Sequence, residues 1–332
     1  MYEYTGYVLL KHQKEGIALS SNSAIQEAPQ NVSKFRNYLR RTWTLYLMLI
    51  LPIAFFVIFR YLPMTNIVMA FKDYNMFKGV WESDWAGFKW FEKAFASKDF
   101  WNSLRNTIML NFLDLLVGFP APIILAILIN EIVFIRFKRI TQTVVYLPHF
   151  LSWIIISGMA FQLLAPSSGV INTFLARYGV GPVEFLGDEK LWVFTYVILG
   201  LWKEVGWNAI IYLAAIAGIN TELYEAAEID GAGRFRKIWH VTLPGIRSTI
   251  IVLLIMNMGR ILGIEFDRPY ALQNTSVMNV ADVISTYVYR VGIRGLQFSL
   301  TAAVGLFQSV VCVVFLLTAN ALAKRFGERG IW

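Results

Sequence analysis

Hydrophobic residues in this chain gather in long blocks that shorter polar segments separate. An α-helix needs about 20 apolar residues to cross roughly 30 Å of hydrocarbon, and six windows approach that length. The pattern therefore predicts six membrane-spanning helices, with both chain ends on the same side of the membrane. The windows are residues 42–62, 104–130, 143–164, 191–216, 248–263 and 298–320.

Two of these windows are irregular. The window 104–130 is long and contains Pro120 and Pro122, which predicts a tilted or kinked helix. The window 248–263 is short and carries Asn257, Gly259 and Arg260. Hydropathy therefore does not define the residue at which the fifth span ends on the outer side.

Composition agrees with a polytopic, all-α membrane protein. Hydrophobic residues make up 57% of the 332 positions and charged residues 16%, which is more apolar than a soluble domain of this size. Cys312, the single cysteine, lies in an apolar run, so no intrachain disulfide can form. The mostly polar residues 1–41 precede the first apolar window, which predicts an uncleaved anchor and no secretory signal.

The distribution of Lys and Arg predicts the orientation. One set of connecting segments carries sixteen of these residues and the other set carries ten, so the richer set is expected to be cytosolic. The net charge of +8 then reflects membrane orientation, and nucleic-acid binding is disfavoured. The richer set is 1–41, 131–140, 217–247 and 321–332, and the poorer set is 63–103, 165–190 and 264–297.

The chain shows no internal repeat or long linker and is interpreted as one membrane domain, residues 42–323. Cytosolic tails, 1–41 and 324–332, flank it, and the first thirty residues are expected to be loosely ordered. The outer segment 63–103 is rich in aromatic residues. It is interpreted either as interfacial helices anchored by an aromatic belt or as a docking surface for a receptor.

A polar island, residues 217–247, separates two apolar windows and predicts a helical elbow. Asn220 and Thr221 are candidate N-caps, and Gly231 is suited to a left-handed helix end. A second helix is expected to start at Arg234 and to stop at Leu243-Pro244. Small side chains on one face of the first helix would let another protein approach closely. That face consists of Leu223, Ala226, Ala227 and Asp230.

Several motifs of enzymes and cofactor proteins are missing from the sequence. No Gly-Lys dipeptide occurs, so the phosphate-binding loop of ATPases is absent. Gly231-Ala232-Gly233 lacks the βαβ context of a dinucleotide site. The three histidines, His12, His149 and His240, lack metal-ligand spacing. The sequence therefore predicts no enzyme, no metal site and no cofactor in this chain.

The elbow resembles the cytoplasmic loop of permease subunits of binding-protein-dependent ABC importers. The matched positions are Glu225, Ala226, Ala227, Gly231, Val241, Leu243 and Pro244, with Val241 where Ile is more usual. Four stretches resemble the branch of that family that imports oligosaccharides, including acidic fragments such as those of alginate or pectin. They are residues 70–75, 202–208, 210–215 and 280–288. The resemblance extends from about Arg40 to the C-terminus.

The resemblance implies six spans with a cytoplasmic coupling helix, in the cytoplasmic membrane of a bacterium. It also implies partners: two cytosolic ATPase subunits that bind ATP and Mg, a related second permease in a heterodimer, and an extracytoplasmic solute-binding protein. Membrane lipid is expected around the spans. The residues implied to dock on the ATPase are Leu223, Glu225, Ala226, Ala227, Asp230, Gly231, Leu243 and Pro244.

Polar residues inside the spans are candidates for a substrate path, because charges in a membrane usually face a cavity or a partner. Aromatic rings stack on sugars, and amides and charges bind hydroxyl groups. Interhelical packing is the alternative role for the same residues. The candidate path is Trp202, Lys203, Trp207, Asn208, Asn257 and Arg260.

Other functions stay open at this point. The importer could take another small solute, such as glycerol phosphate or a disaccharide. A secondary transporter would need coupling charges and usually an inverted repeat, and neither is evident. A non-transporting membrane adaptor would keep the elbow. The sequence leaves the sugar, its charge and the subunit that binds it undecided.

Overall fold

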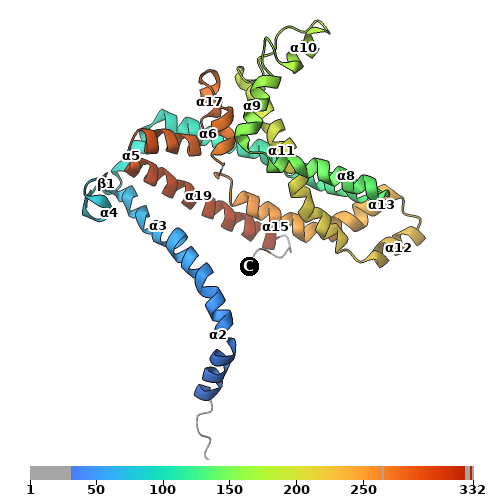
Figure 1. The fold of residues 1–332 in the computed structure, drawn as a ribbon, viewed down its shortest axis with the longest axis horizontal. Coiled ribbons are helices and arrows are strands. Elements are labelled where there is room, and N and C mark those ends of the chain that lie inside the picture. The colour runs from blue at the N-terminus through green and yellow to red at the C-terminus, as the bar shows by residue number, and fades with distance from the viewer. Residues whose placement is uncertain (1–30, 264, 326–329, 331–332) are drawn as a thin grey trace, which may run out of the picture. The chain divides into compact units, whose positions relative to one another are not determined.

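The computed structural model describes residues 31–263, 265–325 and 330 (Figure 1). The expectations for residues 1–30 and for most of the C-terminal tail lie outside these ranges. The chain divides into two units, Met1–Thr65 and Asn66–Trp332, which are described separately.

The first unit is helical wherever it is described. Helix α2 (Asn31–Phe56) continues through the π-helical turn η1 (Val57–Tyr61) into α3 (Leu62–Met64). α2 begins at Asn31, within the segment expected to be a tail. The first candidate span runs over Arg41–Phe71, and none of its most apolar window is buried inside the protein. Such exposure suits a helix that faces lipid.

The aromatic segment after this span contains a small β-hairpin that the sequence did not predict. The 3₁₀ helix η2 (Thr65–Phe71) leads into β1 (Lys72–Asn75), α4 (Gly79–Glu82), β2 (Ser83–Trp85) and α5 (Lys89–Ala96). The strands pair antiparallel, with Lys72 opposite Trp85. Phe71 stacks on Trp85 with ring centroids 5.8 Å apart. Cross-strand and ring contacts therefore stabilise strands where interfacial helices were expected.

Four helices are long and apolar enough to cross a membrane, and two bent helix pairs raise the number to six, counted over the described residues. The long spans in the second unit are α6 (Lys98–Gly118) with α7 (Pro120–Asn130), α11 (Glu189–Ala217), and α19 (Phe298–Arg325). The boundary between α6 and α7 falls at Phe119, beside the prolines on which the predicted kink rested.

The third predicted span, 143–164, is wrong as a single helix. The chain forms α8 (Ile135–Tyr146), the 3₁₀ turn η3 (Leu147–Phe150) and α9 (Trp153–Leu163), with a 98° bend between the two parts. Pro148 lies in the turn, and the Ser152 side chain caps α9 by accepting from the Ile155 amide. These two residues end one helix and start the next.

The elbow's second helix starts at Arg234, as predicted, and ends at Gly245. It runs through α13 (Arg234–Lys237), η4 (Ile238–Thr242) and α14 (Leu243–Gly245), then bends by 59° into α15 (Arg247–Met258). The predicted stop at Leu243-Pro244 falls within one residue of the end of this helix, because Gly245 is its last residue before the bend.

Short helices complete the second unit. They are α10 (Val170–Ala176), α12 (Thr221–Ile229), α16 (Asp267–Leu272), η5 (Thr275–Val277), α17 (Met278–Ala281), α18 (Ile284–Val288) and η6 (Tyr289–Arg294). In Figure 1, α10 lies at one extremity of this unit, and α12 and α13 lie at another.

Helix α11 is the packing centre of the second unit, in contact with α6, α7 and α8. Trp192 and Tyr196 are fully buried in its first half, and Tyr212 is buried in its second half. Gly206 lets the backbone of α8 approach, because a Cβ at this position would overlap the Val145 carbonyl oxygen. Polar groups on α11 are therefore held close to the broken helix.

Candidate functional site

A cavity of about 380 Å³ lies among α6, α7, α11, α15 and the segment that leads to α16. Its apolar wall includes Leu115, Phe119 and Ile211. The rest of the wall is unusually polar for the interior of a membrane protein, which marks the cavity as a candidate binding site. The polar lining residues are Asn111, Asp114, Glu204, Asn208, Asn257, Arg260, Glu265 and Arg268.

Asp114 and Arg268 form a bidentate ion pair in this wall. Arg268 Nη1 lies 2.7 Å from Asp114 Oδ2, and Nη2 lies 3.1 Å from Oδ1. Nη2 also donates to the Tyr196 carbonyl oxygen at 2.5 Å, and the guanidinium carbon lies 3.6 Å from the centroid of the Tyr196 ring. Gly200 leaves room for the guanidinium, since a Cβ there would overlap it. The positive charge of Arg268 is thus neutralised within the chain.

A second polar cluster joins the cavity wall to the break between α8 and α9. His149 Nδ1 lies 2.9 Å from Glu204 Oε2, and the His149 ring stacks on Trp207 at 4.3 Å. The Lys203 ammonium donates to the His149 carbonyl oxygen at 2.6 Å and lies 3.3 Å from Glu204 Oε1. Lys203 is buried, and its charge is opposed by the carboxylate beside it.

Arg260 differs from these two cations. It is exposed in the cavity wall, and within the described part of the chain no carboxylate oxygen lies within 4.0 Å of its guanidinium. The neighbouring Asn257 donates to the Leu253 carbonyl oxygen at 2.9 Å, which leaves its amide oxygen available. The cavity therefore presents the Arg260 guanidinium beside the amides of Asn208 and Asn257, with the Glu265 carboxylate elsewhere in the same lining.

The structure brings part of the predicted path together. Asn208, Asn257 and Arg260 line the cavity, whereas Trp202, Lys203 and Trp207 are absent from its lining. Trp202 and Trp207 stay 43% and 42% exposed on α11.

Sequence reasoning missed Glu265 and Arg268 in the cavity wall. Charged residues directly after an apolar window were the available signal. Arg268 contacts Asp114, which lies 154 positions away. A single sequence carries no pattern that predicts such a long-range pair.

The elbow is held by contacts that fix its two helices. The Asn220 side chain caps α12 by accepting from the Glu222 amide, as predicted. Gly231 has φ +73°, and Ala232 N donates to Ala227 O at 2.8 Å, which closes a left-handed helix end. The Tyr224 hydroxyl lies 3.0 Å from Thr242 Oγ1. Lys237 Nζ lies 2.8 Å from Glu228, and this hydrogen bond lowers the pKa of the Glu228 carboxyl.

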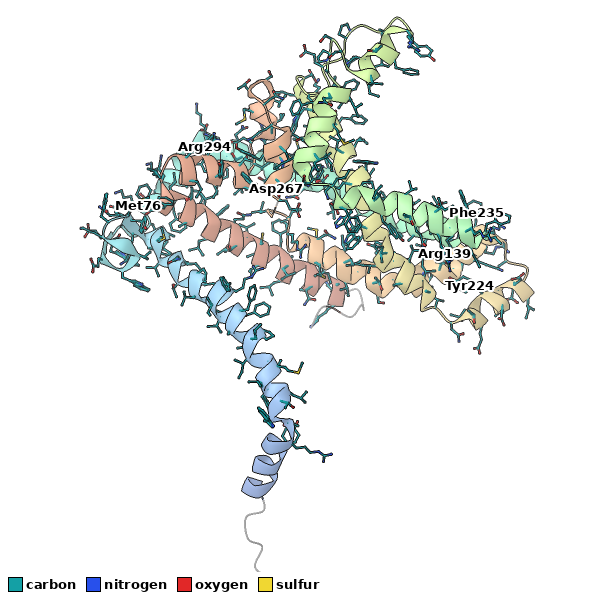
Figure 2. The ribbon with its side chains drawn as sticks, viewed as in Figure 1. Met76, Arg139, Tyr224, Phe235, Asp267 and Arg294 are labelled. Atoms are coloured by element: carbon teal, nitrogen blue, oxygen red, sulfur yellow. The ribbon has the colours of Figure 1, made fainter. Side chains whose placement is uncertain are left out.

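The predicted docking face of the elbow is largely exposed. Leu223, Glu225, Ala226 and Asp230 are exposed, and Ala227 is half-buried. Gly231 is exposed beyond the helix, whereas Leu243 and Pro244 belong to α14. Figure 2 places Tyr224 and Phe235 at the same end of the second unit as Arg139 of α8. The elbow thus presents a rigid, accessible surface at this end.

These features define a polytopic membrane permease with a cavity between its spans and an exposed helical elbow. Residues 118–328 match the family described as binding-protein-dependent transport system inner membrane component. The match covers well over half of the chain, which therefore belongs to this family. The protein is accordingly a multi-pass inner membrane protein and the membrane component of a transport system.

Two Bacillus subtilis (strain 168) proteins are similar along most of their length. Protein LplB is 43% identical over 318 residues, which cover 96% of this chain and 100% of LplB. The polygalacturonan/rhamnogalacturonan transport system permease protein YteP is 44% identical, with 87% and 90% covered. Both similarities extend well beyond the elbow.

A solved structure is similar in fold as well as in sequence. It is a crystal structure of a bacterial alginate ABC transporter in complex with an alginate pentasaccharide-bound periplasmic protein. The similar chain is 41% identical, with a TM-score of 0.82, and the match covers 89% of this chain and 99% of that chain. The predicted architecture of a permease with helical spans is confirmed by this similarity.

The ion pair in the cavity wall yields a prediction about stability. Asp114→Asn leaves the mostly buried Arg268 charge unopposed, and we expect the free energy of unfolding to fall by about 3 kcal/mol. The double variant Asp114→Leu/Arg268→Met buries no unpaired charge and should lose less. Chemical unfolding of the purified protein in detergent measures both. A double variant that is less stable than Asp114→Asn would contradict this account.

Proposed function

We propose that this protein is the permease subunit of an ATP-driven importer that moves oligosaccharides into the cytoplasm by alternating access. The observation that carries the proposal is the combination, in one chain, of a polar cavity among membrane spans with an exposed elbow at which an ATPase can act. The sequence contains no phosphate-binding loop, so the energy comes from another subunit. The named functions of YteP and of the alginate transporter support the substrate class.

In this proposal both termini and the elbow are cytosolic. Residues 1–41 and 324–332 form tails, 42–323 form the permease domain, 63–103 lie outside, and the coupling loop is 217–247. The excess of Lys and Arg in the cytosolic segments supports this orientation.

The partners follow from the missing ATP site and from the cavity among the spans. Two cytosolic ATPase subunits bind ATP and Mg, and one of them receives the exposed face of α12. A related second permease completes the cavity, and an extracytoplasmic binding protein delivers the sugar. Closure of the ATPases on ATP would move the two elbows together and turn the cavity outward, and hydrolysis would reset it.

The substrate is proposed to be an acidic oligosaccharide. A guanidinium binds a carboxylate through two parallel hydrogen bonds, and Arg260 is the cavity cation that Asp114 and Glu204 do not oppose. Asn208 and Asn257 would bind sugar hydroxyl groups. Trp202, Lys203 and Trp207 lie on α11, as Asn208 does, but outside the cavity lining. The exposed indoles would join the path where the second permease closes it.

The docking face leads to a prediction about assembly. Ala226→Asp places a charge at the centre of the small-residue face, and we expect ATPase co-purification to fall at least tenfold while membrane insertion is unchanged. Ala176→Asp makes the same change at an exposed position at the end of α10 and should retain the ATPase. Equal co-purification with both variants would refute docking through α12.

The orientation is tested by labelling cysteines in intact cells, with Cys312 replaced by Ala. Ser168→Cys should react with a membrane-impermeant maleimide from outside, because residues 165–190 are proposed to be extracytoplasmic. Gly233→Cys, which has open space around it, should react only after the cells are opened. The reverse pattern would overturn the orientation.

The substrate charge is tested by ATPase stimulation in liposomes that contain the complete complex and its sugar-loaded binding protein. Arg260→Gln should lower stimulation by an acidic oligosaccharide about tenfold or more, since a hydrogen bond to a charged group contributes about 1.5–3 kcal/mol. Stimulation by a neutral oligosaccharide of equal length should change little, and Arg177→Gln is the control variant. Equal losses for both sugars would refute a carboxylate-binding role.

A further inference from the structure

The turn that carries Arg260 begins where α15 ends inside the membrane domain. α15 ends at Met258, and the turn is closed by bonds from Arg260 N to Asn257 O at 2.9 Å and from Gly263 N to Arg260 O at 2.7 Å. Backbone carbonyl groups beyond a helix end lack helical partners, and lipid supplies no replacement. Their hydrogen bonds come from elsewhere in the protein or from water in the cavity that the turn lines.

Two side-chain amides from different spans supply these hydrogen bonds. Asn111 Nδ2 on α6 donates to the Ile261 carbonyl oxygen at 2.6 Å. Gln308 Nε2 on α19 donates to the Leu262 carbonyl oxygen at 2.5 Å. The two residues after Arg260 are thus held from two directions, by helices that lie far apart in the sequence.

Packing reinforces the same arrangement. The Ile261 and Leu262 side chains are 8% and 2% exposed, and they belong to a core cluster with Leu104, Tyr287 and Leu300. A Cβ at Gly259 would lie 2.8 Å from the Leu316 side chain, so α19 also packs closely on the start of the turn. Arg260 is the exposed side chain between these fixed neighbours.

We infer that Asn111 and Gln308 are positioning residues that fix the Arg260 guanidinium in the cavity. The inference rests on the proposed role of Arg260 in substrate binding. A charged group contributes most to binding when its geometry is set before the substrate arrives, because no ordering cost then remains. Loss of either amide frees the turn, so the guanidinium loses its alignment with the substrate while its charge is retained.

Isosteric variants separate positioning from packing. Asn111→Asp and Gln308→Glu keep the side-chain shape but replace an amide donor with an oxygen that faces a carbonyl oxygen. Each variant should lower sugar-stimulated ATPase in the liposome complex about tenfold, for whichever oligosaccharide depends on Arg260. Gln308→Met removes the amide donor without adding a charge, and methionine is tolerated in a span. If the acidic variants fail to assemble, sugar-stimulated ATPase of Gln308→Met is the measurement that tests the inference.

Double variants identify the route of the effect. If the amides act through Arg260, then Asn111→Asp/Arg260→Gln and Gln308→Met/Arg260→Gln should be no worse than Arg260→Gln alone. Asn106→Asp is the matched control on α6, because Asn106 donates to the Asn279 and Asp282 carbonyl oxygens and is absent from the cavity lining. Its effect should add to that of Arg260→Gln.

The outcomes distinguish this inference from the proposed function. Additive losses for Asn111 and Gln308, as for Asn106, would assign them a merely structural role and overturn the inference. Normal stimulation of the single variants would overturn it as well. If the complex without substitutions responds to no oligosaccharide, the proposed function is refuted. The inference about Asn111 and Gln308 is then refuted as well, because it rests on the proposed role of Arg260.

Discussion

The constraint on which this structure depends is that lipid cannot satisfy a backbone polar group. A continuous helix meets this constraint by itself, but a helix that breaks within the membrane must find donors elsewhere. Here side chains on neighbouring spans provide them: Lys203 donates to the carbonyl oxygen of His149, Asn111 to that of Ile261, and Gln308 to that of Leu262. The break in the third span and the turn after α15 in the fifth are therefore stabilised by polar residues that hydropathy alone counts against a span.

The same requirement shapes the electrostatics of the cavity. Lys203 is opposed by Glu204, and Arg268 by Asp114, so these charges hold the chain together and contribute little net charge to the cavity. Arg260 is carried on a turn that other residues complete, which leaves its guanidinium available. The proposed preference for a carboxylated sugar therefore rests on the local position of the Arg260 guanidinium beside Asn257, since the lining also contains the Glu265 carboxylate. The exposed elbow at the end of the unit that carries Tyr224 and Phe235 gives an ATPase a place to act (Figure 2).

Sequence patterns predicted the features that depend on local chemistry. The cap at Asn220 and the left-handed Gly231 follow from neighbouring residues alone, and the long apolar windows of α11 and α19 follow from composition. The 98° bend near Ser152 interrupts an apolar window that hydropathy counts as one span, so hydropathy alone does not predict it. Asn208, Asn257 and Arg260, which were selected for their polarity, line the cavity, and their role in substrate binding stays a prediction. The placement of Trp207 against His149 and of Arg268 against Asp114 joins distant segments, and one sequence without a contact signal cannot specify such pairs.

The most direct test of the account is a structure of the complete importer, trapped on an ATP analogue with an acidic oligosaccharide inside. The account predicts that the sugar occupies the cavity between α6, α11 and α15, with a carboxylate within hydrogen-bond distance of Arg260 and hydroxyl groups near Asn208 and Asn257. A sugar bound entirely by the second permease, with Arg260 directed to lipid or to a carboxylate of a partner, would contradict it.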